Sequence, residues 1–247
     1  MSISKVNKNI YNLSPKLASI GHLNRIPIVL TDSKGQYLKA QVQDVHPENK
    51  LVWWAKSGAG TEEQFNWLRE NLKSELVNLQ SDHLTLYIWL GTCDLTTKTE
   101  NFIDIKSHDF SAGNKLCRFY RQIHEYISDN HPTIRLIFLQ LPYYSIYFWN
   151  LSHGHSNPEQ FREKDKILEN QISEVNKYIR GFNSVLHPEI NSVDFCLDLE
   201  KSNKPSHRRH ISYCQNYQLY LDGIHPCPEL ARLWVVRLTL RLEKDCQ

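Results

Sequence analysis

The sequence has few of the features that mark secreted, membrane-spanning or disulfide-stabilised proteins. Its 247 residues include no apolar run of about eighteen residues, the length that crosses a bilayer, and the N-terminal stretch lacks the continuous apolar core of a signal peptide. The six cysteines form no Cys-x-x-Cys pair and no dense, regular spacing, which is typical of free thiols in a reducing compartment. We therefore expect an intracellular, cytoplasmic protein without a membrane span.

A strong excess of one charge is also lacking. The chain carries 29 Lys and Arg against 27 Asp and Glu, so it exerts no broad attraction on nucleic acid or anionic membrane. Nucleic acid is therefore not the expected partner, although the N-terminal lysines and the Arg208-Arg209 pair leave that alternative open. His153 and His155 have no third ligand at a recognisable spacing, so neither a metal nor another cofactor is expected.

What the sequence does have is an alternation of apolar runs with amphipathic stretches. The expected strands are residues 26–30, 84–90, 134–141 and 193–199, and the expected helices cover about 61–79, 116–127, 158–182 and 229–242. This order predicts an α/β fold, a three-layer α/β/α sandwich with a mainly parallel central sheet. Residues 25–243 would form one domain, after a flexible N-terminal arm (1–24) and before a C-terminal tail (244–247).

Polar loops follow two of the expected strands. Ser33 comes just after the strand at 26–30, and the segment 91–94 follows the strand at 84–90. Ligands of open α/β sheets bind beyond the carboxyl ends of the strands, so both loops are expected at one site. The segments 143–156 and 201–216 are irregular in pattern and are expected to rim the same site.

The order of these pieces resembles the SGNH, or GDSL-like, hydrolases, whose sequence blocks centre on a Ser, a Gly, an Asn and a His. The matching blocks here are Thr31-Asp32-Ser33, Lys56-Ser57-Gly58-Ala59-Gly60, Gly91-Thr92-Cys93-Asp94 and Asp222-Gly223-Ile224-His225-Pro226. The resemblance runs from Ile26 to about Trp234 and implies the flavodoxin-like fold of that family. Two positions depart from it: Thr31 replaces the usual glycine, and Cys93 replaces the asparagine.

The resemblance implies a serine ester hydrolase, an esterase or deacetylase that forms an acyl-Ser33 intermediate. His225 would act as the base, and Asp222 would hold one ring nitrogen of the imidazole. The oxyanion would be bound by the backbone N–H groups of Ser33 and Gly58, with Gly60 as an alternative to Gly58, and by Cys93. A thiol is a weaker donor than an amide, and the loss of one such donor costs about 3–4 kcal/mol of transition-state stabilisation, so a slower enzyme is expected.

The sequence says less about the substrate than about the reaction. A small-molecule or glycan ester is the expected partner, and the candidate substrate-binding residues are Asp32, Asp94, Tyr143, Arg208 and Arg209. The aromatic residues Trp53, Trp54, Tyr143, Tyr144, Phe148 and Trp149 either line an apolar wall or pack in the core. The alternative function is a catalytically weakened SGNH-like binding module, including an accessory domain of a mobile-element protein.

Overall fold

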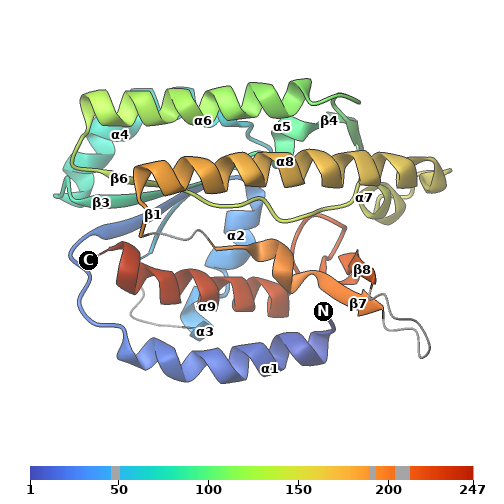
Figure 1. Cartoon of the computed structure of the whole chain (residues 1–247), viewed down its shortest axis with the longest axis horizontal. Coiled ribbons are helices and arrows are strands. Elements are labelled where there is room, and N and C mark those ends of the chain that lie inside the picture. Colours follow the sequence, from blue (N-terminus) through green and yellow to red (C-terminus); the bar gives the residue numbers. More distant parts are fainter. Residues whose placement is uncertain (46–50, 190–192, 204–211, 247) are drawn as a thin grey trace.

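A central parallel sheet organises the molecule. The computed structural model describes residues 1–45, 51–189, 193–203 and 212–246. Within these ranges the main sheet has the order β2 (Val52–Ala55), β1 (Ile26–Thr31), β3 (Leu84–Trp89) and β6 (Arg135–Phe138), and every neighbouring pair is parallel. Helices cover both faces of the sheet, so the predicted three-layer α/β/α fold is confirmed (Figure 1).

The side chains of the buried strands alternate between two apolar cores. Ile28 and Leu30 face a core shared with α4 (Thr61–Leu79), α6 (Ser111–Asn130) and α8 (Arg162–Leu186). Val29 faces a second core shared with α2 (Ser33–Lys39) and α9 (Pro228–Asp245). A strand buried on both faces has no polar side, which explains why these runs are almost purely apolar.

The register of the sheet brings three strand ends to one level. Thr31, the last residue of β1, lies beside Ala55 at the end of β2 and beside Trp89 at the end of β3. The loops that follow these strands therefore leave the sheet side by side. This is the edge at which the sequence predicts the site.

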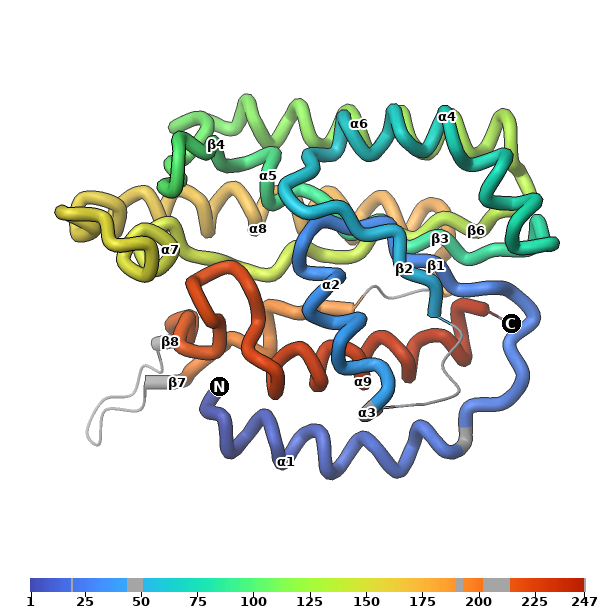
Figure 2. The backbone as a smooth tube through the Cα atoms, turned by 180° about the vertical axis from the view of Figure 1, so that it is seen from behind, coloured from blue at the N-terminus to red at the C-terminus, as the bar shows by residue number. Residues whose placement is uncertain are grey.

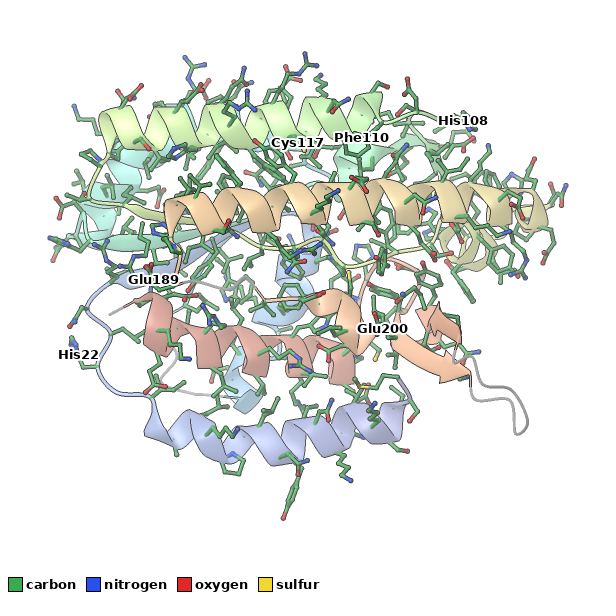
Figure 3. All side chains as sticks on the ribbon, in the orientation of Figure 1. His22, His108, Phe110, Cys117, Glu189 and Glu200 are labelled. Carbon is green, nitrogen blue, oxygen red and sulfur yellow. The ribbon has the colours of Figure 1, made fainter. Side chains whose placement is uncertain are left out.

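Both cores consist of closely packed aliphatic and aromatic side chains. Trp89, Trp234 and Phe195 contact one another in the second core, with ring centroids between 4.8 and 5.9 Å apart. Phe110 and Cys117, both at the α6 side of the first core, lie between α6 and α8 (Figure 3). All six cysteines are free thiols.

The N-terminal segment differs from the expected flexible arm. Residues 3–13 form helix α1 (Ile3–Leu13), which packs on the outer side of α9 and buries Val6 completely (Figures 1 and 2). The expected C-terminal tail is also packed, since α9 continues to Asp245 and Cys246 is fully buried. Both ends of the described chain bury apolar groups, which an arm or a tail would leave in water.

The predicted strand at 193–199 is wrong. The described residues there form a 3₁₀ turn, η3 (Phe195–Asp198), because the Asp194 carboxylate accepts a hydrogen bond of 2.9 Å from the Cys196 N–H and begins the turn. Phe195 and Leu199, four residues apart, are both fully buried. The apolar pattern thus reflects one face of a helical turn rather than a strand.

Several short elements complete the described chain. Their bounds are α3 (Val42–Val45), α5 (Thr92–Leu95), α7 (Ile146–Ser152), the 3₁₀ turns η1 (Ser14–Ser19), η2 (Pro158–Phe161) and η4 (Tyr217–Leu219), and the antiparallel pairs β4 (Thr96–Thr99) with β5 (Phe102–Ile105) and β7 (Glu200–Asn203) with β8 (Ser212–Gln215). In the parts of the chain described, no helix is both long and apolar enough to cross a membrane.

Candidate active site

Ser33 is presented by the junction of β1 and α2. The Asp32 carboxylate accepts a hydrogen bond of 3.0 Å from the Lys34 N–H and so caps α2, which begins at Ser33. Gly35 allows the first turn of α2 to lie directly against β1, since a Cβ at this position would overlap the Thr31 Cγ2 methyl group. The close approach fixes Ser33 at the carboxyl edge of the sheet.

Asp222 and His225 occupy the loop before α9. The Asp222 Oδ1 atom accepts hydrogen bonds from the backbone N–H groups of Ile224, at 3.0 Å, and His225, at 2.8 Å, which turns the loop back on itself. The Asp222 Oδ2 atom lies 2.6 Å from His225 Nδ1. Burial raises the pKa of Asp222, but the hydrogen bonds and charge of His225 outweigh burial and hold this pKa below its ordinary value.

The two segments meet across the edge of the sheet. Ser33 Oγ lies 2.8 Å from His225 Nε2, although the residues are 192 positions apart in sequence. Since Nδ1 faces the ionised Asp222, it carries the proton, and Nε2 is free to accept one from Ser33. The Tyr37 ring stacks on the imidazole at a centroid distance of 4.6 Å and restricts its rotation.

Helix α7 supports the loop that carries the histidine. The Ser145 N–H donates to the Gly223 carbonyl at 3.0 Å, and Ser145 Oγ donates to Asp165 at 2.5 Å. Gly223 has φ +94°, and a Cβ there would lie 2.8 Å from the Trp149 backbone nitrogen, so no other residue fits without a shift. Burial raises the pKa of Asp165 to about 6.

A pocket of about 500 Å³ opens beside Ser33 and His225. This volume is within the range of small-molecule sites. Gly58, from the loop after β2, and Cys93, from α5 after β3, line the same pocket. Its apolar wall includes Tyr37, Trp149, Ile103 and Ile224.

The predicted oxyanion donors, Ser33, Gly58 and Cys93, therefore line the same pocket, and Ser33 is also the predicted nucleophile. The Ser33 N–H is at the first position of α2, where a backbone N–H has no partner within its own helix. Burial raises the pKa of the Cys93 thiol to about 11, so the thiol is protonated at neutral pH. A protonated thiol is a donor, but a weak one.

Asp32 has a different environment from the one predicted. Its side chain is buried, and its carboxylate contacts the equally buried Lys34 ammonium at 2.5 Å. The same ammonium donates to Thr92 Oγ1. Asp32 lies at the wall of the pocket, but its hydrogen-bonding capacity is directed to Lys34 and to the start of α2 rather than to a ligand.

Two other predicted substrate contacts lie elsewhere. The Asp94 carboxylate accepts hydrogen bonds from the Thr61 N–H and hydroxyl, at distances from 2.8 to 3.2 Å, and so caps α4. The Tyr143 hydroxyl is 2.7 Å from Ser173 Oγ, and Tyr143 does not line this pocket in the described part of the chain. Arg208 and Arg209 fall outside the described residues.

Sequence reasoning missed two parts of the site. Tyr37 follows Ser33 by four residues on α2, a spacing that places both on one helix face and could have indicated the contact. The hairpin β4–β5 supplies a wall of the pocket, with Lys98 and Lys106 among its lining residues. β4 is polar, and β5 has only four residues, so neither strand is long enough for a periodic pattern to mark it.

Comparisons with known proteins identify the fold. The sequence matches no protein-family model and no curated protein. The structure is similar to a GDSL-like lipase from Bacteroides thetaiotaomicron, with a TM-score of 0.57, 14% identity and coverage of 96% of this chain and 98% of the other. It is also similar to a lipase/acylhydrolase from Enterococcus faecalis, with a TM-score of 0.53, 11% identity and coverage of 90% and 97%. The chain therefore has the fold of the SGNH, or GDSL-like, hydrolases.

Proposed function

We propose that the protein is a serine ester hydrolase in which Ser33 is the nucleophile, His225 the general base and Asp222 the residue that orients the base. The observation that supports this most is the unbroken chain of contacts from Ser33 Oγ to His225 Nε2, at 2.8 Å, and from His225 Nδ1 to Asp222 Oδ2, at 2.6 Å. These contacts give a hydroxyl, a base and an orienting carboxylate within hydrogen-bond reach of one another beside a pocket.

The reaction has two halves. In the first, Ser33 Oγ bonds to the ester carbonyl carbon while its proton passes to His225 Nε2, and the imidazolium is stabilised by Asp222. The C–O bond to the alcohol then breaks, and the alcohol leaves with that proton. In the second half, His225 takes a proton from water, which attacks acyl-Ser33 and releases the carboxylic acid and the serine hydroxyl.

The oxyanion that forms in both halves requires donors aimed at the carbonyl oxygen. The Ser33 and Gly58 N–H groups take this role in the proposal, and Cys93 adds a weak third donor. The fold shared with a GDSL-like lipase and a lipase/acylhydrolase is consistent with acyl transfer from an ester.

Hydrolysis of para-nitrophenyl acetate by the full chain tests the proposal. Ser33→Ala and His225→Ala should each lower kcat by about a thousandfold or more, because the nucleophile and its base act as a unit. Ser128→Ala, which changes an exposed serine on α6, is the matched control and should be as active as the wild type. Equal turnover by wild type and Ser33→Ala would reject the mechanism.

Cys93 supports a second candidate, a binding module that keeps the scaffold without efficient turnover. A fluorophosphonate probe separates the two, because it forms a covalent bond only with an activated hydroxyl. Labelling of Ser33 that disappears in His225→Ala supports the hydrolase. A Ser33 that is never labelled in a folded protein supports the binding module.

A further inference from the structure

The hairpin β4–β5 brings two lysines to the pocket that contains Ser33 and His225. Lys98 lies in β4, and Lys106 directly follows β5. Both side chains are exposed, and both line the pocket. An ester hydrolysis needs no ammonium group at either position, so the mechanism above leaves both lysines without a role.

The nearby carboxylates already have other partners. Asp32 pairs with Lys34, Asp222 with His225, and Asp104 of the hairpin with Lys164 at 2.7 Å. Asp94 caps α4. Burial raises the pKa of Asp94, and its hydrogen bonds with Thr61 and the charge of Lys106 offset this rise only in part; within the described residues Asp94 and Lys106 form no ion pair. Within the residues described, neither Lys98 nor Lys106 has a carboxylate within ion-pair distance. Lys98 and Lys106 thus place two ammonium groups at the pocket that form no ion pair in the described part of the chain.

Lys98 and the candidate base His225 both contact the Trp149 ring. Its ammonium lies 5.6 Å from the centroid of the Trp149 ring, and that ring lies 5.8 Å from the centroid of the His225 ring. A cation above an aromatic face is attracted to the ring, so Lys98 has a preferred place over the wall of the pocket. The Trp149 ring thus lies between a cation–π contact with Lys98 and a ring contact with His225, and all three residues line one pocket.

We propose, on the basis of the esterase function above, that the pocket selects esters that carry an anionic group, a carboxylate, phosphate or sulfate, which Lys98 and Lys106 bind. A neutral ester makes no use of either ammonium group. The anion belongs either to the acyl part or to the alcohol part of the ester, and substrates of both kinds distinguish these sources.

Two matched pairs of esters test the proposal. In the first pair the alcohol part varies, as para-acetoxybenzoate against the neutral para-acetoxybenzamide. In the second pair the acyl part varies, as the mono-para-nitrophenyl ester of adipic acid against para-nitrophenyl heptanoate. For at least one pair, kcat/KM should be about fivefold or more in favour of the anionic ester, and this preference should fall at high salt.

Variants assign the preference to the two lysines. Lys98→Gln and Lys106→Gln should each reduce the ratio of kcat/KM for the anionic ester to kcat/KM for the neutral ester by about two- to threefold, and the double variant should bring that ratio close to one. Lys166→Gln, which changes an exposed lysine on α8 paired with Glu163, is the control and should alter neither ester.

The outcomes separate this proposal from the esterase proposal. Turnover of neutral and anionic esters at equal rates overturns the anion preference and leaves the esterase intact. An anion preference that survives in the double variant also overturns it. If no ester is hydrolysed, calorimetry with para-acetoxybenzoate and para-acetoxybenzamide on the wild-type protein tests the subsite directly, and equal binding of the two rejects it.

Discussion

At the scale of single residues, Cys93 has the clearest consequence for rate. It lines the pocket beside Ser33 and Gly58, and its thiol stays protonated because burial raises its pKa to about 11. Cys93→Asn replaces a weak donor with an amide, so kcat for para-nitrophenyl acetate should rise by about tenfold or more, since a full oxyanion donor contributes about 10²–10³ in kcat. Steady-state kinetics measures this.

The control for this prediction is Cys93→Ala, which removes the thiol without adding a donor. Its kcat should fall by less than about tenfold, because a thiol donates weakly. A large loss in Cys93→Ala together with no gain in Cys93→Asn would mean that the thiol itself takes part in the reaction, which contradicts the role given to it here.

Asp222 gives a prediction for acid stability. Its pKa lies below the unfolded value of 3.8, so the ionised carboxylate stabilises the fold above about that pH, and this contribution disappears as the pH falls through the folded pKa. At about pH 7, Asp222→Asn should lower the free energy of unfolding by about 1–3 kcal/mol. Denaturation with urea at several pH values should show the difference shrinking as the pH falls below 3.8 and through the lower folded pKa. A constant difference at all pH values would contradict the assignment.

The residues that the sequence predicted in the site are those with a motif around them. Ser33 follows a buried strand, and Asp222 and His225 precede a helix with a defined spacing, but the order of these blocks and their resemblance to the SGNH hydrolases selected them, since each local pattern is common in other proteins. The 2.6 Å contact of His225 with Asp222 is local to one loop, whereas the 2.8 Å contact of Ser33 with His225 depends on how that loop lies against the end of β1, which a single sequence does not contain. Lys98 belongs to no motif, and its place above Trp149 arises only when the hairpin and α7 fold together.

At the scale of elements, the junction of β1 and α2 sets the position of Ser33, the proposed nucleophile. Gly35→Ala would bring a methyl group into the Thr31 Cγ2 atom, and such overpacking costs about 1–3 kcal/mol. We expect a lower melting temperature and a lower kcat together, because relief of the overlap shifts α2 and therefore Ser33.

The double variant Thr31→Ser/Gly35→Ala tests that cause. Serine lacks the Cγ2 methyl group, so the double variant should recover part of the stability and part of kcat lost in Gly35→Ala. Thermal unfolding and steady-state kinetics of the two single variants and the double variant measure the coupling. Strictly additive losses would show that the overlap with Thr31 is not the cause.

Strongly periodic elements were predicted well, and elements whose pattern is ambiguous were not. The helices α4 and α6 have clear apolar faces over about five turns, and both were predicted. The segment 193–199 has the apolar content of a strand, but Asp194 caps a turn there. The edge strand β2 contains Trp53 and Trp54, which pack against the two cores from opposite faces, whereas the sequence left open whether they line an apolar wall of the site or pack in the core.

At the scale of the whole molecule, the fold extends beyond the block pattern that indicated it. The resemblance begins at Ile26, and residues before it were expected to form an arm. Helix α1 instead adds a layer outside α9, with Val6 fully buried and Tyr11 about 80% exposed on the opposite side. The sequence around α1 contains no block of the family pattern, so the resemblance could not include it. The packing of α1 on α9 shows that it belongs to the same domain.

This packing predicts an asymmetric response to substitution in α1. Val6→Ala should lower the free energy of unfolding by about 1–2 kcal/mol, because it removes buried methyl groups and leaves a cavity against α9. Tyr11→Ala, in the same helix, should change it by less than about 0.5 kcal/mol, because the Tyr11 side chain lies mostly in water. Urea denaturation of the full chain compares the two. If α1 were an unpacked arm, the free energy of unfolding of both variants would match that of the wild type. A lower free energy of unfolding in Val6→Ala alone requires that α1 unfolds together with the rest of the domain, including β1 and the Ser33 that follows it.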